Sequence, residues 1–321
     1  MSEAFQPSTD GHPSHERSTD HLDDLTIREK IAALIVIILP FAALAVGIYL
    51  AWGRGFTWVD AGLLVGGYVL TALGVTVGYH RYFTHSSFKT NAVVKAGLAI
   101  LGSTAVEGPP TKWAAIHRCH HQHSDDDHDP HSPHHHGGGV LGIIRGFFHA
   151  HMGWILRGDP KNLDRYNPDL RSDKVTMVMS KLWTVWALLG FVIPALLGGW
   201  LAGGLTTWSW TGFGLGFLWG GLVRLLVVHH VTWSINSVCH IWGSRPFKSN
   251  DESRNNVLFG IIGLGEGWHN NHHAFPTSAR HGLRWWQIDL SYYVIVGMKY
   301  LGLAYDIKVP SPSRQAMKRV G

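Results

Sequence analysis

The chain has 321 residues, of which only 15% are charged, while 38 are glycine and 15 are tryptophan. Because soluble globular proteins carry about 25% charged residues, this composition excludes an ordinary soluble protein. A mean hydropathy of +0.04 equally excludes a chain made only of membrane spans. The 2 cysteines exclude a disulfide framework, and we expect Cys119 and Cys239 to be reduced and to bind no metal.

Residues 1–24 are polar and predict a flexible N-terminal tail, followed by a membrane domain over 25–310 and a C-terminal tail over 311–321. Uncharged runs at 31–52 and 61–79 are each long enough to cross a hydrocarbon core about 30 Å thick. The uncharged stretch 182–223 is long enough to cross twice, so we expect a hairpin of spans at 182–201 and 208–228. Shorter apolar stretches at 96–105 and 257–265 predict buried or interfacial helices. The predicted fold is an all-α membrane protein with four spans and a helical cap formed by 80–181 and 229–310.

Lysine and arginine are distributed unevenly along these segments. Three precede the first span, 12 lie in 80–181 and 10 follow residue 229, which makes 25 of the 27 on one side of the membrane. The positive-inside tendency assigns that side to the cytoplasm. We therefore expect both termini and the cap to be cytoplasmic, in the inner membrane of a bacterium or the endoplasmic reticulum of a eukaryote. Because this bias accounts for the net charge of +5, no nucleic-acid partner is expected.

Histidine is the unusual residue, with 23 copies. Eight of them form three clusters in the cap: His80 and His85, then His117, His120 and His121, then His269, His272 and His273. On a helix, the spacing His-x-x-His-His places three imidazoles within an arc of roughly 100°. His80 and His85 would lie roughly 140° apart on an ideal helix, so they can share a metal only if the helix ends between them, or else they serve two metals.

Imidazole binds zinc, copper, iron and nickel, whereas calcium and magnesium prefer oxygen. Eight histidines exceed the needs of one tetrahedral ion, so the clusters predict two metal ions. The other histidines lack this pattern. We interpret His134 to His136 as a solvated loop, and His229 and His230 as interfacial residues or as neighbours of metal ligands. His123, His128 and His131 follow the second cluster without its periodicity.

The arrangement resembles the membrane fatty acyl desaturases of the stearoyl-CoA (delta-9) desaturase family. The resemblance covers about Ile31 to Pro310 and rests on the three histidine clusters and on Gly265-Glu-Gly-Trp268 before the third. Further matches are Phe88-Lys89, Asp129-Pro-His131, Asn236-Ser-Val-Cys-His240 and the closing Gly302-Leu-Ala-Tyr-Asp306.

The resemblance implies a dinuclear iron centre, in which zinc can replace iron in a crystal or a recombinant preparation. The implied ligands are His80, His85, His117, His120, His121, His240, His269, His272 and His273, with Asn236 holding a metal-bound water. It also implies an acyl tunnel whose bend is lined by Trp113, Thr232 and Trp233. The sequence departs from animal members at Ala115-Ile116, where those proteins have an Arg-Asp pair associated with coenzyme A.

The sequence therefore predicts an enzyme that uses O2 and an external electron donor to insert a cis double bond into a fatty acyl substrate. The resemblance favours carbon 9 and acyl-CoA, and leaves a lipid-linked or carrier-protein-linked chain open. The donor would be a cytochrome b5-like protein, a ferredoxin or a rubredoxin with an NAD(P)H reductase. A fatty acid or alkane hydroxylase is an alternative that uses similar histidine clusters. A metal transporter or storage protein is another, although transport favours ligands inside the spans and the clusters lie outside them.

Overall fold

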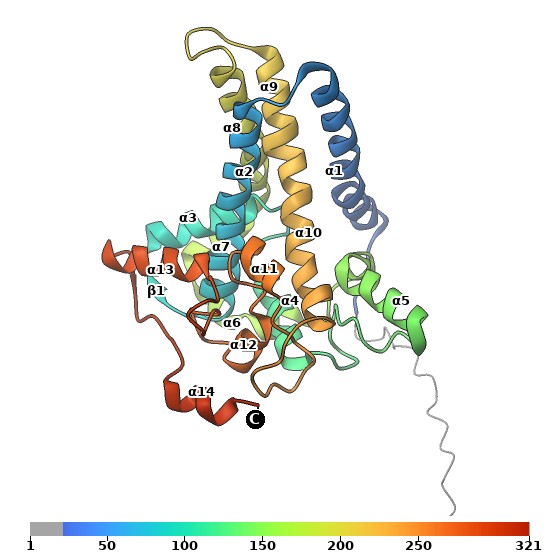
Figure 1. Ribbon diagram of the computed structural model, residues 1–321, viewed down its shortest axis with the longest axis vertical. Helices are drawn as coiled ribbons and strands as arrows, with labels where there is room; N and C mark the ends of the chain where they lie inside the picture. The colour runs from blue at the N-terminus through green and yellow to red at the C-terminus, as the bar shows by residue number, and fades with distance from the viewer. Residues whose placement is uncertain (1–21, 321) are drawn as a thin grey trace, which may run out of the picture.

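The computed structural model describes residues 22–320, and four long apolar helices dominate that part of the chain (Figure 1). They extend over Ile27–Arg54, Trp58–Thr84, Trp183–Leu201 and Trp210–His240. This confirms the predicted all-α fold with four candidate membrane spans. The second and fourth helices run past their predicted ends at 79 and 228, because an apolar run marks where contact with lipid ends, not where the helix ends.

The spans contain two π-helical stretches. In chain order they are built from α1 (Ile27–Arg54), α2 (Trp58–Leu73) with the π-helix η1 (Gly74–Thr84), α8 (Trp183–Leu201), and then α9 (Trp210–Gly216), the π-helix η4 (Phe217–Val223), α10 (Arg224–Ser237) and the 3-10 turn η5 (Val238–His240). The expected hairpin is formed by α8 and α9, with its turn after Leu201.

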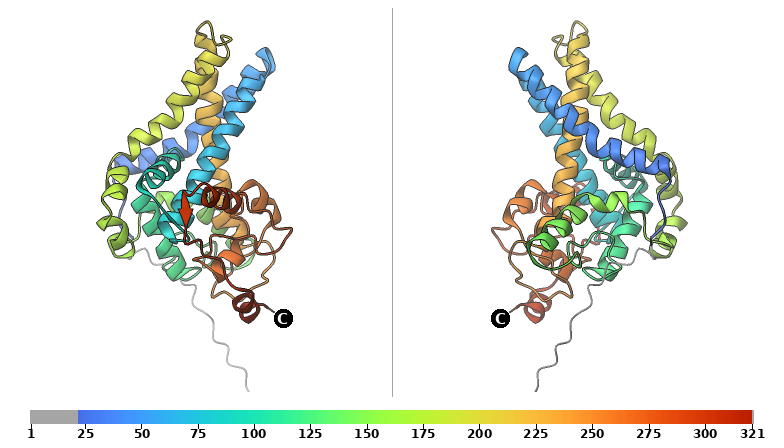
Figure 2. Two further views of the ribbon diagram at one scale, coloured as in Figure 1. Left: turned by 90° about the vertical axis from the view of Figure 1, so that its left-hand side faces the viewer. Right: turned by 90° about the vertical axis from the view of Figure 1, so that its right-hand side faces the viewer.

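The remaining elements form a cap at one end of the spans, as Figure 2 shows. Its helices are α3 (Ala92–Ser103), α4 (Pro110–His123), α5 (Gly139–His151), α6 (Pro168–Ser172), α7 (Lys174–Lys181), α11 (Val257–Ile262), α12 (His269–Ala274), α13 (Leu290–Tyr300) and α14 (Pro312–Lys318), with 3-10 turns η2 (Gly153–Leu156) and η3 (Leu163–Tyr166). Two short strands, β1 (Lys89–Thr90) and β2 (Ala304–Tyr305), pair antiparallel. The apolar stretches expected at 96–105 and 257–265 correspond to α3 and α11.

The first two spans begin earlier than their apolar runs. Thr26 and Thr57 each cap a helix by accepting a hydrogen bond from the backbone of the residue three positions later, Glu29 and Asp60, whose carboxylate returns to the cap. Such a capping box satisfies backbone donors that the first turn leaves unpaired. The helices therefore start at the box, several residues before hydropathy marks a span.

The predicted tails have different outcomes. The N-terminal tail at 1–24 lies almost entirely outside the described residues; at its end, the backbone N–H of Asp23 donates to Asp159 O (2.8 Å). The segment 311–321 contains α14, and the Lys318 Nζ donates to Ala274 O at 2.7 Å. The C-terminal segment is therefore attached to the cap beside α12.

Arg224 lies inside the fourth span and is almost fully buried. Its guanidinium donates to Gly220 O (3.1 Å) on its own span, to Thr71 Oγ1 (3.2 Å) on α2, to Thr104 O (2.7 Å) after α3, and to Gly190 O (2.9 Å) on α8. A charged side chain inside a membrane protein needs such polar partners because the surroundings offer no water. Arg224 thus links the second, third and fourth spans.

Glycine allows the second span to pack closely against the cap. A Cβ built on Gly74 would lie 2.3 Å from both Gly102 N and the Leu101 carbonyl carbon, which are backbone atoms of α3. A built Cβ on Gly102 would in turn lie 2.4 Å from the ring of Tyr79. The crossing of η1 and α3 therefore requires glycine on both helices.

We predict that Gly74→Ala destabilises the protein, because the added methyl must push two backbones apart. Overpacking of this kind costs about 1–3 kcal/mol. Gly66→Ala on α2 is the matched control, since its Cβ would have no neighbour within 4 Å. Thermal unfolding in detergent should show a lower midpoint for Gly74→Ala only; equal midpoints for the two variants would contradict this account of the crossing.

Candidate metal centre

The structure brings the clustered histidines together where the spans meet the cap. They form two groups, and within each the candidate ligand atoms lie within 4.8 Å of one another. The first group contains His80, His85, His117, His121 and His272, and the second contains His120, His240, His269 and His273. The rings of His121 and His273 stack at 4.4 Å, so the groups adjoin. All nine histidines that the family resemblance implies as ligands lie in one of these two groups.

The π-helix η1 explains how His80 and His85 reach the same group. The backbone N–H of His85 donates to His80 O across five residues (3.2 Å), and the two ring centroids lie 4.9 Å apart. A π-helical turn aligns positions i and i+5, which an α-helix would separate. The helix ends at Thr84, between the two histidines, so the structure matches the first of the two arrangements expected from the sequence, and both rings join one group.

The two His-x-x-His-His motifs divide their histidines between the groups. From α4, His117 and His121 join the first group and His120 joins the second. From α12 the division is reversed, because His269 and His273 join the second group and His272 joins the first. On an α-helix, positions i and i+4 lie about 40° apart and position i+3 lies about 60° to the other side of i. Each motif therefore contributes to two neighbouring sites.

Buried carboxylates orient four of these rings. The Nδ1 atom contacts a carboxylate oxygen in each of four pairs: His80 with Glu266 (2.5 Å), His120 with Asp129 (2.9 Å), His240 with Asp125 (2.8 Å) and His273 with Asp251 (2.6 Å). A carboxylate accepts the Nδ1 proton, so the lone pair stays on Nε2 and is available to a metal. Burial alone would raise the pKa of Asp129 and Asp251, but attraction to the paired imidazoles outweighs it and holds both pKa values well below the usual range.

The donor set fits two transition-metal ions. Buried ring nitrogens without a hydrogen-bond partner include Nε2 of His85, His120 and His273. Burial, together with neighbouring imidazoles, holds the pKa of His269 and His272 well below the usual range, so both are neutral at pH 7. Neutral imidazole suits iron, zinc, copper and nickel, and each group contains enough nitrogen donors for one such ion.

Sequence reasoning assigned no role to several residues around this centre. Asp125, Asp251 and Glu266 are the carboxylate partners just described, and His281 lies in a further group with His80 and Glu266. Glu266 and Asp129 belong to two of the motifs that carry the family resemblance, but the sequence did not predict their contacts with histidines. Asp125 directly follows the second cluster, and the need of a ligating imidazole for a carboxylate partner was the signal that could have identified it. Asp251 and His281 have no distinguishing local pattern.

The remaining histidines of residues 22–320 lie outside the two groups. His229 Nε2 contacts Ala105 O (2.6 Å), and its ring stacks on Trp233, so it belongs to a cavity wall. His230 pairs with His151 at 2.8 Å. Cys119 and Cys239 are buried and form no disulfide.

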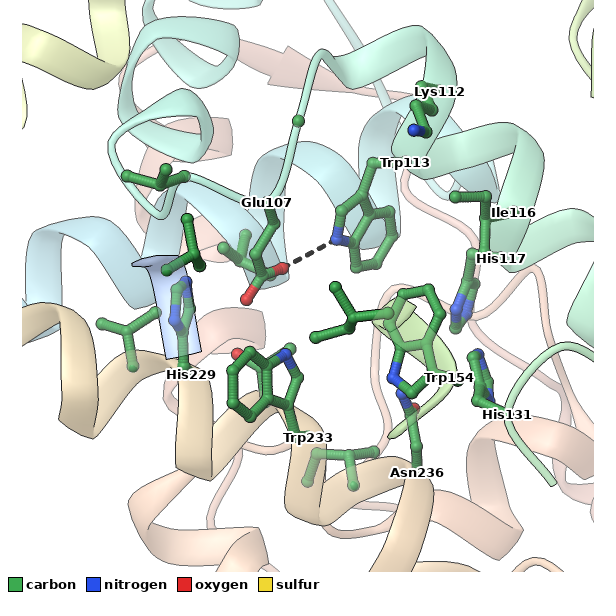
Figure 3. Close-up of a pocket in the computed structure, with 18 of the residues that line it drawn as sticks. Glu107, Lys112, Trp113, Ile116, His117, His131, Trp154, His229, Trp233 and Asn236 are labelled. Atoms are coloured by element: carbon green, nitrogen blue, oxygen red, sulfur yellow. Dashed lines mark hydrogen bonds between the residues drawn. The ribbon is translucent and has the colours of Figure 1, made fainter. Parts of the chain in front are cut away.

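A largely apolar cavity of about 400 Å³ borders both groups (Figure 3). His80 and His117 of the first group and His269 of the second line it. All the residues that the resemblance implies for an acyl tunnel, Trp113, Thr232 and Trp233, are also in its wall, as is Asn236. No contact between Asn236 and a histidine of the two groups is found in the described structure, so its role in holding a water stays a prediction.

Trp113 connects the cavity wall to the metal centre. Its indole stacks on His117 with centroids 5.1 Å apart, and its Nε1 donates to Glu107 Oε2 at 2.8 Å. Figure 3 shows Trp113 and Glu107 joined in this way on one side of the cavity, with Trp233 facing them. The position of this aromatic wall is therefore fixed relative to a candidate ligand.

Comparison with known proteins agrees with this geometry. Residues 56–305 match the family model "Fatty acid desaturase". A hex-5-enoyl-[acyl-carrier protein] acetylenase from Moorena producens is 41% identical over 289 residues, covering 89% of this chain and 88% of the relative. An icosanoyl-CoA 5-desaturase from Limnanthes douglasii is 37% identical, covering 88% and 73%. An sn-1 stearoyl-lipid 9-desaturase from Anabaena variabilis is 34% identical, covering 84% and 92%.

The family match spans most of the chain and includes all three histidine clusters. The similarity covers 88% of the Moorena producens relative and 92% of the Anabaena variabilis relative. The sequence resemblance, the four candidate spans and the paired histidine groups thus lead to one conclusion. This chain belongs to the membrane fatty acid desaturase family.

Proposed function

We propose that this protein uses O2 and external electrons to insert a cis double bond, at carbon 9, into a saturated acyl chain at a dinuclear iron centre. The observation that carries the proposal is the position of the cavity, which His80, His117 and His269 border together. An acyl chain in this cavity would lie against both histidine groups. The names of the three relatives, two desaturases and an acetylenase, support chemistry that removes hydrogen from acyl chains.

In this proposal the nine grouped histidines hold two iron ions, and Asn236 holds a metal-bound water. Bound there, the ions would supply the redox chemistry by which dioxygen, two external electrons, two protons and two hydrogens of the chain become two molecules of water. Burial keeps rings such as His269 and His272 neutral. Glu266, Asp125, Asp129 and Asp251 fix the direction of four rings by accepting the proton on Nδ1.

The cavity would select and align the substrate. Each methylene moved from water into an apolar site contributes about 0.8 kcal/mol, so a long saturated chain binds without polar contacts along its length. Trp113 is fixed by Glu107 and by His117, so it can determine which methylenes face the metals. Trp233 and Thr232 would hold the chain from the opposite wall.

The proposal also concerns the group that carries the acyl chain and the protein that donates the electrons. The three relatives are named for chains on a carrier protein, on coenzyme A and on a lipid. The sequence resemblance favours acyl-CoA, and the charges that line the cavity are a second criterion for the carrier. We place the cap and both ends of the chain in the cytoplasm, because 25 of the 27 lysines and arginines lie on that side. A ferredoxin, rubredoxin or cytochrome b5-like donor would dock there.

We predict that His272→Ala abolishes the unsaturated product, because it removes a nitrogen that lies 3.0 Å from His80 Nε2 and 2.9 Å from His121 Nε2. The variant should still accumulate in the membrane, with iron reduced from about two ions per chain. His128→Ala, an exposed histidine outside both groups, is the control and should keep full activity. Gas chromatography of lipids from a desaturase-deficient host measures the product.

Two outcomes of that experiment would contradict the proposal. Full complementation by His272→Ala would remove the metal assignment. Hydroxylated chains in place of alkenes from the unmodified protein would identify the hydroxylase alternative, because the two activities differ in whether oxygen remains on the chain.

Glu107 is a buried ionisable group in the largely apolar cavity wall. Burial raises the pKa of its carboxyl to about 7, against hydrogen bonds from Trp113 and Thr232 that lower it. Its Oε1 atom is buried without a partner. Below pH 4.5, its ordinary pKa, the group is neutral both folded and unfolded, so it costs nothing. Between pH 4.5 and about 7 the unfolded chain releases this proton while the folded chain keeps it, so stability falls across that window and levels off above it.

We therefore predict that Glu107→Gln raises the thermal unfolding midpoint at pH 8, by the equivalent of about 3 kcal/mol, and that most of this gain disappears at pH 5. Gln keeps an oxygen that can accept from Trp113. Asp306→Asn, at an exposed ion pair with Lys89, is the control and should change little at either pH. A gain that is equal at pH 5 and pH 8 would show that the titration of Glu107 is not its cause.

A further inference from the structure

The two halves of α1 have different surroundings. The buried residues of this helix, Pro40, Ala43 and Gly47, all lie in its second half, where Ala43 packs beside Trp219 of the fourth span. The first half, from Ile27 to Leu39, has no buried residue. In Figure 1, α1 lies at the side of the bundle, beside α10. The first half of α1 is therefore a span segment that does not pack tightly against its neighbours.

One face of this first half lines the cavity. Glu29, Ala32, Ala33 and Val36 follow one another at helical spacing and all border it. Glu29 and Ala32 are nevertheless exposed. Because these residues face the cavity and the exterior at once, the cavity opens alongside the first turns of α1. Ala32 lies within a candidate membrane span, so this mouth is at the surface of the bilayer.

The rest of the lining near these turns comes from the cap and the third span. Ile155 of η2, Asp159, Lys112 of α4 and Trp183 at the start of α8 line the cavity, while Trp154 contacts the ring of His131. On α1, exposed Ile31 and Leu34 lie on the face turned away from the cavity. The rim is mostly apolar, and tryptophan is typical of the boundary between hydrocarbon and water.

The charges at the mouth do not suit a polyanionic carrier. Lys112 is the only cation in the described lining, and its Nζ is paired with Asp159 at 2.5 Å, while Glu29 adds a second acid to the mouth. A carrier rich in phosphate or carboxylate would need unpaired cations at this place. The nearby cations Arg28, Lys30 and Arg157 are exposed and outside the lining, so none of them adds a second positive charge to the cavity wall.

We propose that the acyl chain enters sideways from the bilayer while it is still esterified to a membrane lipid, between the first half of α1 and the segment 154–159. This inference rests on the proposed function and names its substrate class. The ester bond stays intact, and only the two hydrogens at the new double bond are lost, with the same balance of O2, electrons and protons. The apolar chain passes the rim without crossing water, and the headgroup stays at the interface.

A lipid that cannot exchange its chain tests this directly. Membranes that contain the protein, with NADPH and the soluble fraction of the expressing host, would receive a phosphatidylglycerol with a deuterated octadecyl chain in ether linkage. Deuterated stearoyl-CoA and stearoyl-carrier protein are given in separate arms. Mass spectrometry of intact molecules shows where the alkene forms. We expect it in the ether-linked chain, which no acyltransferase can move to another carrier.

The other outcomes are distinct. An alkene found only on stearoyl-CoA or on the stearoyl-carrier protein, with the ether lipid unchanged, would overturn lateral entry and leave the proposed desaturase function intact. No alkene in any arm would overturn both.

A pair of variants on α1 tests the route itself. Ala32→Phe places a ring in the mouth and should lower the rate on the ether lipid at least tenfold, with iron content and membrane accumulation unchanged. Leu34→Phe, on the exposed face of the same turn, should keep the original rate. Equal rates for the two variants would show that the chain does not pass α1.

Discussion

Imidazole nitrogens whose lone pairs face one another in dry protein repel unless a cation or a proton lies between them. In this protein, Nε2 of His80 and His272 lie 3.0 Å apart, and Nε2 of His240 and His269 lie 3.1 Å apart. Protonation is opposed by burial, which keeps rings such as His269 and His272 neutral. A bound metal is the partner that satisfies this arrangement, and Glu266 and Asp125, behind His80 and His240, prevent those two rings from turning away.

That requirement accounts for much of the surrounding architecture. A π-helix such as η1 is a rare backbone conformation, frequently found at functional sites. Here it places His80 and His85 in one group. Close packing of Gly74 against α3 holds this π-helix against the cap. The division of each His-x-x-His-His motif between two sites requires α4 and α12 to face each other across the centre. These local features are understandable only when the two groups are considered together.

The sequence was sufficient for those parts of the structure that depend on composition over many residues. Three uncharged runs, the last long enough to cross twice, identified four spans, and the number of clustered histidines indicated two metals. The π-helical winding at His85 could not be predicted, because no residue pattern within Gly74–Thr84 distinguishes it from an α-helix. The partnership of Asp251 with His273 joins residues 22 positions apart through tertiary packing, and nothing local reports it. Helix starts were displaced because Thr26 and Thr57 cap their helices before the apolar runs begin.

Arg224 also has a consequence for motion. A guanidinium remains protonated in proteins, so it cannot escape the cost of burial by losing its charge. Its hydrogen bonds reach α2, α8 and Thr104, and none of the four goes to α1. If the helices that it joins moved apart, the Arg224 guanidinium would lose its hydrogen bonds inside the membrane. The three spans therefore move together as one rigid body. A movement of the membrane helices that lets a bulky molecule in or out would therefore be a movement of α1, relative to the other three spans.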